Sequence, residues 1–452
     1  MLKRTLKRAM LATLGALLLA LAASASAGAA WTAPTGIAGT ATVPVETPPE
    51  SAIDADGDAF FIWIDKNDQV QARVRTAATG RLGPILKLSA SSLTPPPVSE
   101  PTVAVNPRGD ALFAWASMNA AGTQNQIVCR SRTAAGTLGP IRNCLSQNKD
   151  LGQIADPQVA LDADGDAVIA WHQEGAASQI MAKTRSAAGQ LSGTKTIAGN
   201  LNIEATGYEV AMDSGGEAVF AYGQNTPTVE GQVFARVLSP TGTLARAKAL
   251  ASPQAALGGE HGEGTQLALN PRGDAAFTWT RTDALTGKDV IEGRVLTDDD
   301  VLKKTVRLSA GDTEVGASEV DISNAGAAVF AWTQKSATIG KSQLLGRSLS
   351  AANALGRTQI LSGTANDVFH GHLGVSGTGD ALFVWQDKDA TTGKPVVQSR
   401  AMTAAGALRP AVRVAALESE PFDLELEVAG NGKATAVWRN GGLKRIEASF
   451  GP

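Results

Sequence analysis

Two sets of polar side chains recur in this chain at spacings that could support chemistry. The first is the segment DADGD, which places carboxylates at alternate positions at Asp54, Asp56 and Asp58 and again at Asp162, Asp164 and Asp166. Alternate carboxylates can converge on a hard cation such as calcium. Other copies of this segment carry Pro-Arg or Ser-Gly instead, and no later acidic ligand follows. A hairpin turn of the Asp/Asn-x-x-Gly type explains every copy, so we expect a turn and keep calcium as the weaker interpretation.

The second set consists of hydrogen-bonding residues placed seven positions before a recurring glycine. We call them the mouth residues, and they are Glu50, Thr102, Gln158, Glu209, Gln266, Glu319, His372 and Glu425. If they surround one opening, they could bind a polar or cationic ligand such as a glycan or a basic peptide. Two carboxylates about 5 to 10 Å apart could instead act as acid and base in polysaccharide cleavage. The plainer alternative is that they are solvated strand ends.

The recurring glycine marks an eightfold repeat, best seen in DADGDAVIAW at 162–171. The marker glycines are separated by 52, 56, 51, 57, 53, 53 and 53 residues. That period is longer than a helix pair and suits four short strands with their turns. It also overrides the expectation that a chain of 452 residues divides into two or three domains.

Each unit predicts the same series of strands. A short apolar strand such as 157–161 precedes the turn, and the strand after the turn is apolar on both faces and ends in Trp or Tyr. Such a strand is covered on both sides, as in stacked sheets. A third strand such as 180–186 usually carries one Arg or Lys. A fourth strand often opens with Leu-Gly-Pro, and proline suits an outermost strand.

The two ends of the chain predict a closed ring. The eighth unit has three strands, over 424–429, 433–439 and 444–450, and residues 31–37 resemble its missing fourth strand. Pairing the ends removes the exposed edges of the stack. We therefore predict an all-β, eight-bladed β-propeller of four-stranded antiparallel blades over 28–452, with 28–43 holding the outer strand of the closing blade. A seven-bladed ring and two smaller rings are the alternatives.

The repeat resembles exported bacterial repeat β-propeller proteins, through its polar turn, Gly-Asp-Ala, apolar run and Trp behind a leader segment. The resemblance covers nearly all of the mature chain and implies a fold and a compartment. The Asp-rich turns are also faintly similar to those of FG-GAP propellers. The sialidase Asp-box, the WD40 pairing of Gly-His with Trp-Asp and the quinoprotein Trp motif are not found in the sequence.

The first 27 residues read as a signal peptide. Basic residues precede an apolar run over 9–23, and Ala25-Ser26-Ala27 suits the peptidase. The run is short for a membrane span. Without the leader's four basic residues, 36 basic residues face 43 acidic ones, a net charge of 36 − 43 = −7. No basic block remains, which argues against a nucleic-acid partner. We expect a secreted, periplasmic or cell-surface protein.

The only two cysteines, Cys129 and Cys144, flank a predicted turn in the second unit. A hairpin there brings them roughly opposite each other, and export favours oxidation, so we predict a disulfide, with two buried thiols as the alternative.

Together these features favour a monomeric, non-enzymatic binding or scaffold propeller without a cofactor. Its partner would be an extracellular glycan or protein, bound where the long segments 90–101, 252–264 and 418–422 surround the channel mouth. The alternative is an extracellular polysaccharide hydrolase or lyase that uses paired mouth carboxylates. Seven of the eight Trp belong to the repeat, which leaves few aromatic rings to stack on sugars.

Overall fold

The structure is a computed structural model of the chain. It describes residues 30–39, 45, 47–89, 98–119, 125–144, 154–174, 178–201, 207–226, 229–251, 265–283, 285–311, 313–364, 366–368, 371–417, 421–441 and 444–451. The predicted signal peptide and most of the three long segments lie outside these residues. Within the described part, no helix has the length and apolar character needed to cross a membrane.

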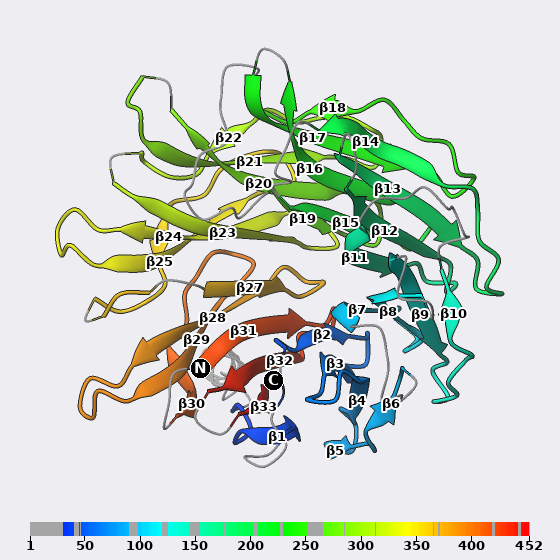
Figure 1. The fold of residues 1–452 in the computed structure, drawn as a ribbon. Coiled ribbons are helices and arrows are strands. Elements are labelled where there is room, and N and C mark those ends of the chain that lie inside the picture. Colours follow the sequence, from blue (N-terminus) through cyan, green and yellow to red (C-terminus); the bar gives the residue numbers. More distant parts are fainter. Residues whose placement is uncertain are drawn as a thin grey trace, which may run out of the picture.

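The chain forms eight antiparallel sheets arranged as the blades of a β-propeller around a centre (Figure 1). In each blade the innermost strand comes first and the next two follow outward in sequence order, joined by hairpins, whereas the outermost strand of the last blade comes from the N-terminal end of the chain. The all-β fold and the number of blades predicted from the repeat are therefore confirmed.

The first four blades have these strands. Blade one comprises β2 (Glu50–Ile53), β3 (Ala59–Ile64), β4 (Val70–Thr76), β5 (Arg81–Leu82) and β6 (Leu86–Lys87). Blade two comprises β7 (Val98–Val105), β8 (Ala111–Met118), β9 (Asn125–Arg132) and β10 (Arg142–Asn143). Blade three comprises β11 (Ile154–Leu161), β12 (Ala167–Gln173), β13 (Ser178–Arg185) and β14 (Lys195–Leu201). Blade four comprises β15 (Tyr208–Met212), β16 (Ala218–Thr226), β17 (Val229–Leu238) and β18 (Lys248–Ala249).

The remaining four blades repeat the arrangement. Blade five comprises β19 (Gln266–Leu269), β20 (Ala275–Thr282), β21 (Asp289–Leu296) and β22 (Val306–Arg307). Blade six comprises β23 (Val315–Ile322), β24 (Ala328–Lys335), β25 (Ser342–Leu349) and β26 (Gln359–Ile360). Blade seven comprises β27 (Gly371–Val375), β28 (Ala381–Lys388), β29 (Pro395–Met402) and β30 (Val412–Ala416). Blade eight comprises β31 (Pro421–Val428), β32 (Ala434–Asn440), β33 (Arg445–Phe450) and β1 (Thr35–Ala38).

The ring closes through its two chain ends. β1 lies beside β33 in the strand order β1-β33-β32-β31, with Thr35 opposite Ala448. The N–H of Thr32 also donates to the carbonyl of Phe450 at 2.9 Å. The closure predicted from the incomplete eighth unit is confirmed, although the paired strand lies slightly later than the predicted segment 31–37.

The second strand of each blade supplies the contact between blades. On β12, Ala167, Ile169 and Trp171 belong to a buried cluster with blade two, while Val168 and Ala170 belong to another cluster with blade four. All five side chains are almost inaccessible to water. The pattern of a strand apolar on both faces therefore marks strands packed between neighbouring sheets.

An arginine on the third strand holds adjacent blades together at their outer edges. Arg294 Nε donates to the carbonyl of Lys303 in its own blade at 2.6 Å, and Nη1 donates to the carbonyl of Leu250 in the preceding blade at 2.9 Å. The same double contact recurs at Arg73, Arg130, Arg236, Arg347 and Arg400. Because guanidinium is a fixed fork of donors, one side chain can satisfy carbonyls on two sheets.

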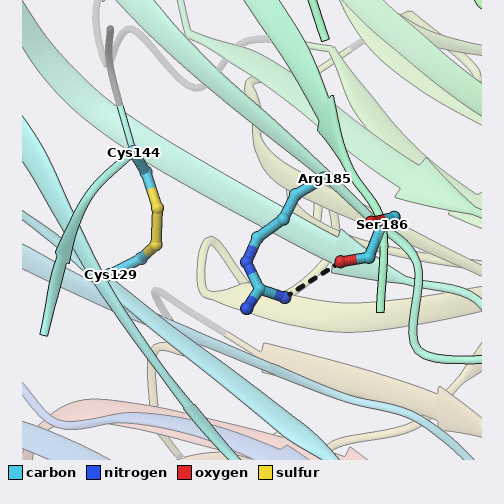
Figure 2. The surroundings of a disulfide bond; sticks show 4 residues. All are labelled: Cys129, Cys144, Arg185 and Ser186. Atoms are coloured by element: carbon cyan, nitrogen blue, oxygen red, sulfur yellow. Dashed lines mark hydrogen bonds between the residues drawn. A yellow bond between two sulfur atoms is a disulfide. The ribbon is translucent and has the colours of Figure 1, made fainter. Parts of the chain in front are cut away.

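Cys129 and Cys144 form the predicted disulfide, with their Cα atoms 5.9 Å apart (Figure 2). Cys129 lies on β9, and Cys144 directly follows the short outer strand β10. Both residues are buried among the apolar side chains between blades two and three. Figure 2 also shows Arg185 of blade three, whose Nη1 donates to the carbonyl of Ser186 at 3.4 Å.

Candidate functional site

A cavity of about 1140 Å³ opens where the innermost strands begin. Four mouth residues line it, Glu50, Thr102, Gln158 and Glu209. The described lining also includes the carboxylates of Glu100, Asp156 and Glu427, and no Lys, Arg or His is among these described lining residues. We call this cavity the acidic mouth. The sequence placed the eight mouth residues at one end of the innermost strands, and the structure brings four of them around one cavity.

Several mouth residues also connect one innermost strand to the next. Gln158 Oε1 accepts the N–H of Val210 at 3.1 Å, and Glu209 Oε2 accepts the N–H of Leu267 at 2.5 Å. In each case the donor belongs to the next blade, in the residue directly after that blade's own mouth residue. A strand at a sheet edge leaves backbone groups unpaired, so a side chain from the neighbouring blade satisfies them. These mouth residues are therefore structural links, which neither of the sequence interpretations anticipated.

The same link recurs on the other side of the channel. Glu319 Oε2 accepts the N–H of Leu373 at 2.7 Å, while its Oε1 lies 2.8 Å from Nδ1 of His372. Ser51 Oγ donates to Glu425 Oε2 at 3.2 Å, which joins blade eight to blade one. Gln266, the remaining mouth residue, begins β19 directly before Leu267.

Two acidic residues lie one pleat deeper in the channel. Six innermost strands carry Ala or Gly two positions after the mouth residue, whereas blades six and eight carry Asp321 and Glu427. Asp321 Oδ2 accepts the N–H of Val375 at 2.6 Å, so it repeats the interblade link at a second level. Sequence reasoning noted the small residues here and missed these two carboxylates. The two-residue period of a strand would have placed them on the same face.

A third group of acidic residues forms the outer rim. Glu100 and Asp156 lie two positions before their mouth residues, with φ of 51° and 49°, in the left-handed region that few non-glycine residues adopt. Glu100 Oε2 accepts the N–H of Asp156 at 2.7 Å, and the hydroxyl of Tyr208 donates to the carbonyl of Asp156 at 2.5 Å. Only the spacing of two residues from the mouth positions marked this group in the sequence.

Several channel carboxyl groups have raised pKa values, which shifts them toward their neutral forms. Burial raises the pKa of Glu209 to about 8, which the N–H of Leu267 partly opposes, and burial raises the pKa of Glu427 to about 8. Burial raises the pKa of Asp321 to about 6.

Glu50 keeps an exposed surface, yet the surrounding protein displaces enough water to raise its pKa to about 7, against the hydrogen bond from Thr102. Burial, and then repulsion from Glu50 and Glu427, raises the pKa of Glu425. Losing water disfavours a charged carboxylate, and nearby negative charges add to the effect.

The Asp-rich turns lie at the opposite ends of the innermost strands. Asp54 Oδ1 accepts the N–H groups of Asp56 and Asp58 at 3.0 and 2.8 Å, and Asp162 makes the equivalent bonds to Asp164 and Asp166, both at 2.9 Å. The marker glycine has φ of +87° in the first copy, which favours Gly. Asn106 makes the same pair of bonds without a carboxylate. Within the described residues, no three Asp, Glu, His or Cys side chains gather as metal ligands. Turn geometry thus accounts for the recurrence of Asp here.

The fold is similar to that of the WD40 domain of SCAP from fission yeast, with a TM-score of 0.51, 9% identity, and coverage of 93% of this chain and 98% of that one. Two further similar structures are the lectin BP39L from Burkholderia pseudomallei (TM-score 0.49, 10% identity, coverage 82% and 99%) and the polysaccharide lyase Uly1 (TM-score 0.43, 10% identity, coverage 84% and 91%). No protein-family model matches the chain, and no curated protein matches its sequence. The eight sheets define the class of protein, an eight-bladed β-propeller, and the comparisons show a similarity of fold alone.

Proposed function

We propose that this propeller is a binding protein that takes a cationic ligand, such as a Lys- or Arg-containing peptide segment, at the acidic mouth. The observation that carries the proposal is the composition of that cavity. Its described lining holds Glu50, Glu100, Asp156, Glu209 and Glu427 and no basic side chain. A concave site lined by one sign of charge concentrates the opposite charge.

The raised pKa values add an energetic reason for this choice. At neutral pH, Glu209 and Glu427 are largely protonated in the unliganded protein, since the pKa of each is raised to about 8. A bound ammonium or guanidinium group favours the charged carboxylate and so lowers the pKa. Binding then releases protons, and affinity rises as the pH is raised from 6 to 8.5.

Calorimetric titration with hexalysine at pH 6 and pH 8.5 tests this proposal, with hexaglutamate as the charge control. We expect hexalysine to bind more tightly at pH 8.5 and to weaken with added salt. Glu427→Gln removes a carboxyl group from the lining of the acidic mouth, and Asp56→Asn removes an exposed carboxylate from the turn at the opposite end of β2. The first variant should weaken binding several-fold and the second should not. Equal effects of the two variants, or no binding, would contradict the proposal.

Polysaccharide cleavage is the second candidate function. Glu50 and Glu425 lie on adjacent innermost strands, and their charges interact, which is a feature of paired acid and base groups. A pKa of about 7 at Glu50 suits a general acid. The described lining of the acidic mouth holds no basic side chain that could pair with an anionic chain, so a neutral polysaccharide is the fitting substrate. Release of reducing ends that disappears in Glu50→Gln would support this function over simple binding.

We further propose that the protein acts outside the cytoplasm as a monomer. The disulfide supports this location, because such bonds persist in oxidising compartments. Expression of the full chain in a bacterial host, followed by fractionation and mass spectrometry, should find a product that begins at residue 28. Retention of the uncleaved chain in the cytoplasm would refute the location, and sedimentation analysis tests the monomer.

A further inference from the structure

A second cavity, of about 790 Å³, lies across blades six, seven and eight. Its lining comes from the β24–β25 connection at Lys341, the segment before β27 at Asn366 and Asp367, the end of β28, and the start of β31. Among the mouth residues only His372 reaches it. We call it the blade-seven cavity, and it differs from the acidic mouth in volume and in the charges of its lining.

The charges of the blade-seven cavity are balanced by contacts already in place. Lys341 Nζ lies 2.9 Å from Asp367 Oδ2, and Asp367 Oδ1 accepts the N–H of Ser342 at 2.9 Å. Asp423 Oδ2 lies 2.9 Å from Nε of Arg439. A cationic ligand is attracted less strongly here than at the acidic mouth, and an anionic ligand is repelled by the carboxylates of the lining. The balance therefore favours an uncharged ligand.

Polar groups of the lining are held in fixed positions. Asn366 Nδ2 donates to Asp387 Oδ1 at 2.8 Å and to the carbonyl of Lys388 at 3.0 Å. Gln386, from the same end of β28, also lines the cavity. The N–H groups of Asn366 are used in these two bonds, so Asn366 Oδ1 and the Asp387 carboxylate can accept from hydroxyl groups, while an amide such as that of Gln386 carries both donor and acceptor atoms. A site ordered before binding loses less entropy on binding.

Phe422 adds an aromatic surface. The residue is 51% exposed, and it lines the cavity. The guanidinium carbon of Arg439 lies over the ring, 6.0 Å from its centroid. The ring therefore lies beside a cation at the cavity, while about half of the residue's surface stays open to solvent. An aromatic ring beside polar groups suits a ligand with a flat C–H face and hydroxyl edges.

We infer that the blade-seven cavity is a binding site for neutral glycans, in which Phe422 packs against a sugar ring while Asn366, Gln386 and Asp387 bond its hydroxyl groups. The site is separate from the proposed cation-binding mouth and does not depend on it. A nucleoside, whose base also stacks on aromatic rings, is the competing class of ligand.

Saturation-transfer NMR on the full-length protein tests the inference with defined probes. The probes are cellohexaose, maltohexaose, xylohexaose, mannohexaose and chitohexaose, with hexagalacturonate as the anionic comparison and adenosine as the stacking comparison. At least one neutral hexasaccharide should show transfer, with the anionic comparison and adenosine weaker. Transfer from none of the five, or stronger transfer from adenosine, would overturn the inference.

Variants then locate the binding. Phe422→Ala should weaken binding of the responding hexasaccharide at least tenfold, and Asp387→Asn should weaken it several-fold. Because Phe422 is half exposed, its replacement should leave the thermal midpoint nearly unchanged, which is measured in parallel. Glu427→Gln in the acidic mouth should leave the binding of this probe unchanged. Full binding by a folded Phe422→Ala variant would overturn the assignment even if a glycan binds elsewhere, whereas failure of hexalysine binding bears only on the acidic mouth.

Discussion

Glu209 Oε2 lies 2.5 Å from the backbone nitrogen of Leu267, so a single carboxylate both lines the acidic mouth and joins blade four to blade five. Gln158 occupies the equivalent position one blade earlier and accepts the equivalent N–H, of Val210. The link therefore needs an acceptor oxygen and does not need a charge.

This relationship predicts different outcomes for two substitutions of Glu209. Glu209→Gln keeps an acceptor for the N–H of Leu267, as Gln158 does for Val210, and should preserve the fold. Glu209→Ala leaves that partly buried donor without its acceptor and should lower the free energy of unfolding by about 1 to 3 kcal/mol. Chemical denaturation measures both variants. Equal loss in both would show that the link has no structural role.

Glu209 also predicts how stability depends on pH. Its pKa is raised from 4.5 to about 8 in the folded state, so folding favours the neutral form. The contribution to stability is fully present below pH 4.5 and is lost as the pH rises through about 8. The thermal midpoint should therefore fall between pH 5 and pH 8.5, by on the order of a few °C. Glu209→Gln should reduce this fall, while ionisation of Glu50, Glu425, Glu427 and Asp321 accounts for the remainder. An undiminished fall in the variant would contradict the assignment.

The arginine contacts between blades predict a graded loss of stability. Arg294→Ala removes the donors to the carbonyls of Lys303 and Leu250, and should cost about 2 kcal/mol, since hydrogen bonds from charged groups are stronger than neutral ones. Arg294→Lys keeps the charge but loses the fork, so an intermediate value is expected. Blade three carries Lys183 at this position, which shows that lysine fits there. Urea denaturation orders the three proteins, and a lysine variant less stable than the alanine variant would refute the explanation.

The disulfide should contribute about 3 kcal/mol, because Cys129 and Cys144 are separated by 15 residues and closing a loop of that size restricts the unfolded chain. Replacing both with Ala, or reducing the wild-type protein, should lower the unfolding midpoint in guanidinium by a corresponding amount. Thiol titration of the untreated protein under denaturing conditions should find no free thiol. Two reactive thiols would refute the bond directly.

The turn at Asp54 predicts that amide and carboxylate are interchangeable there. Asp54→Asn should change stability by less than about 0.5 kcal/mol, because Asn106 already makes both backbone bonds in blade two, whereas Asp54→Ala should cost about 1 to 2 kcal/mol. In calorimetric titration with calcium, the wild-type protein should show no saturable binding heat that is missing from the Asp54→Asn variant. Such a heat would restore the calcium interpretation.

The sequence was sufficient for the fold because each repeat states the same local rule. A glycine with positive φ, an Asp, Asn or Ser three residues before it in seven of the eight copies, and a strand apolar on both faces after it agree with one another. The three-stranded last unit implied the closing strand. The acidic residues deeper in the channel were harder to predict from the sequence. Asp321 and Glu427 replace the small residues of the other blades, and their importance depends on which carboxylates face one another across the channel.

The blade-seven cavity was not predicted at all. Its side chains come from three blades, and Lys341, Asn366 and Phe422 share no spacing in the sequence that would bring them together. Phe422 lies just outside the repeat pattern, where a single aromatic residue carries no periodic signal. Only the tertiary arrangement of the blades reveals that these residues line one cavity.

The pairing of β1 with β33 also affects the order in which the blades can fold. The N–H of Phe450 donates to Thr32 Oγ1 although the two residues are 418 positions apart. Contacts between such distant residues form slowly because a long loop must close first. Seven blades can assemble from contiguous segments as the chain is made, but blade eight requires both of its ends. Circular permutation that transfers residues 30–39 to follow residue 452 would make the last blade contiguous as well, and the ring would then close without waiting for the opposite end of the chain.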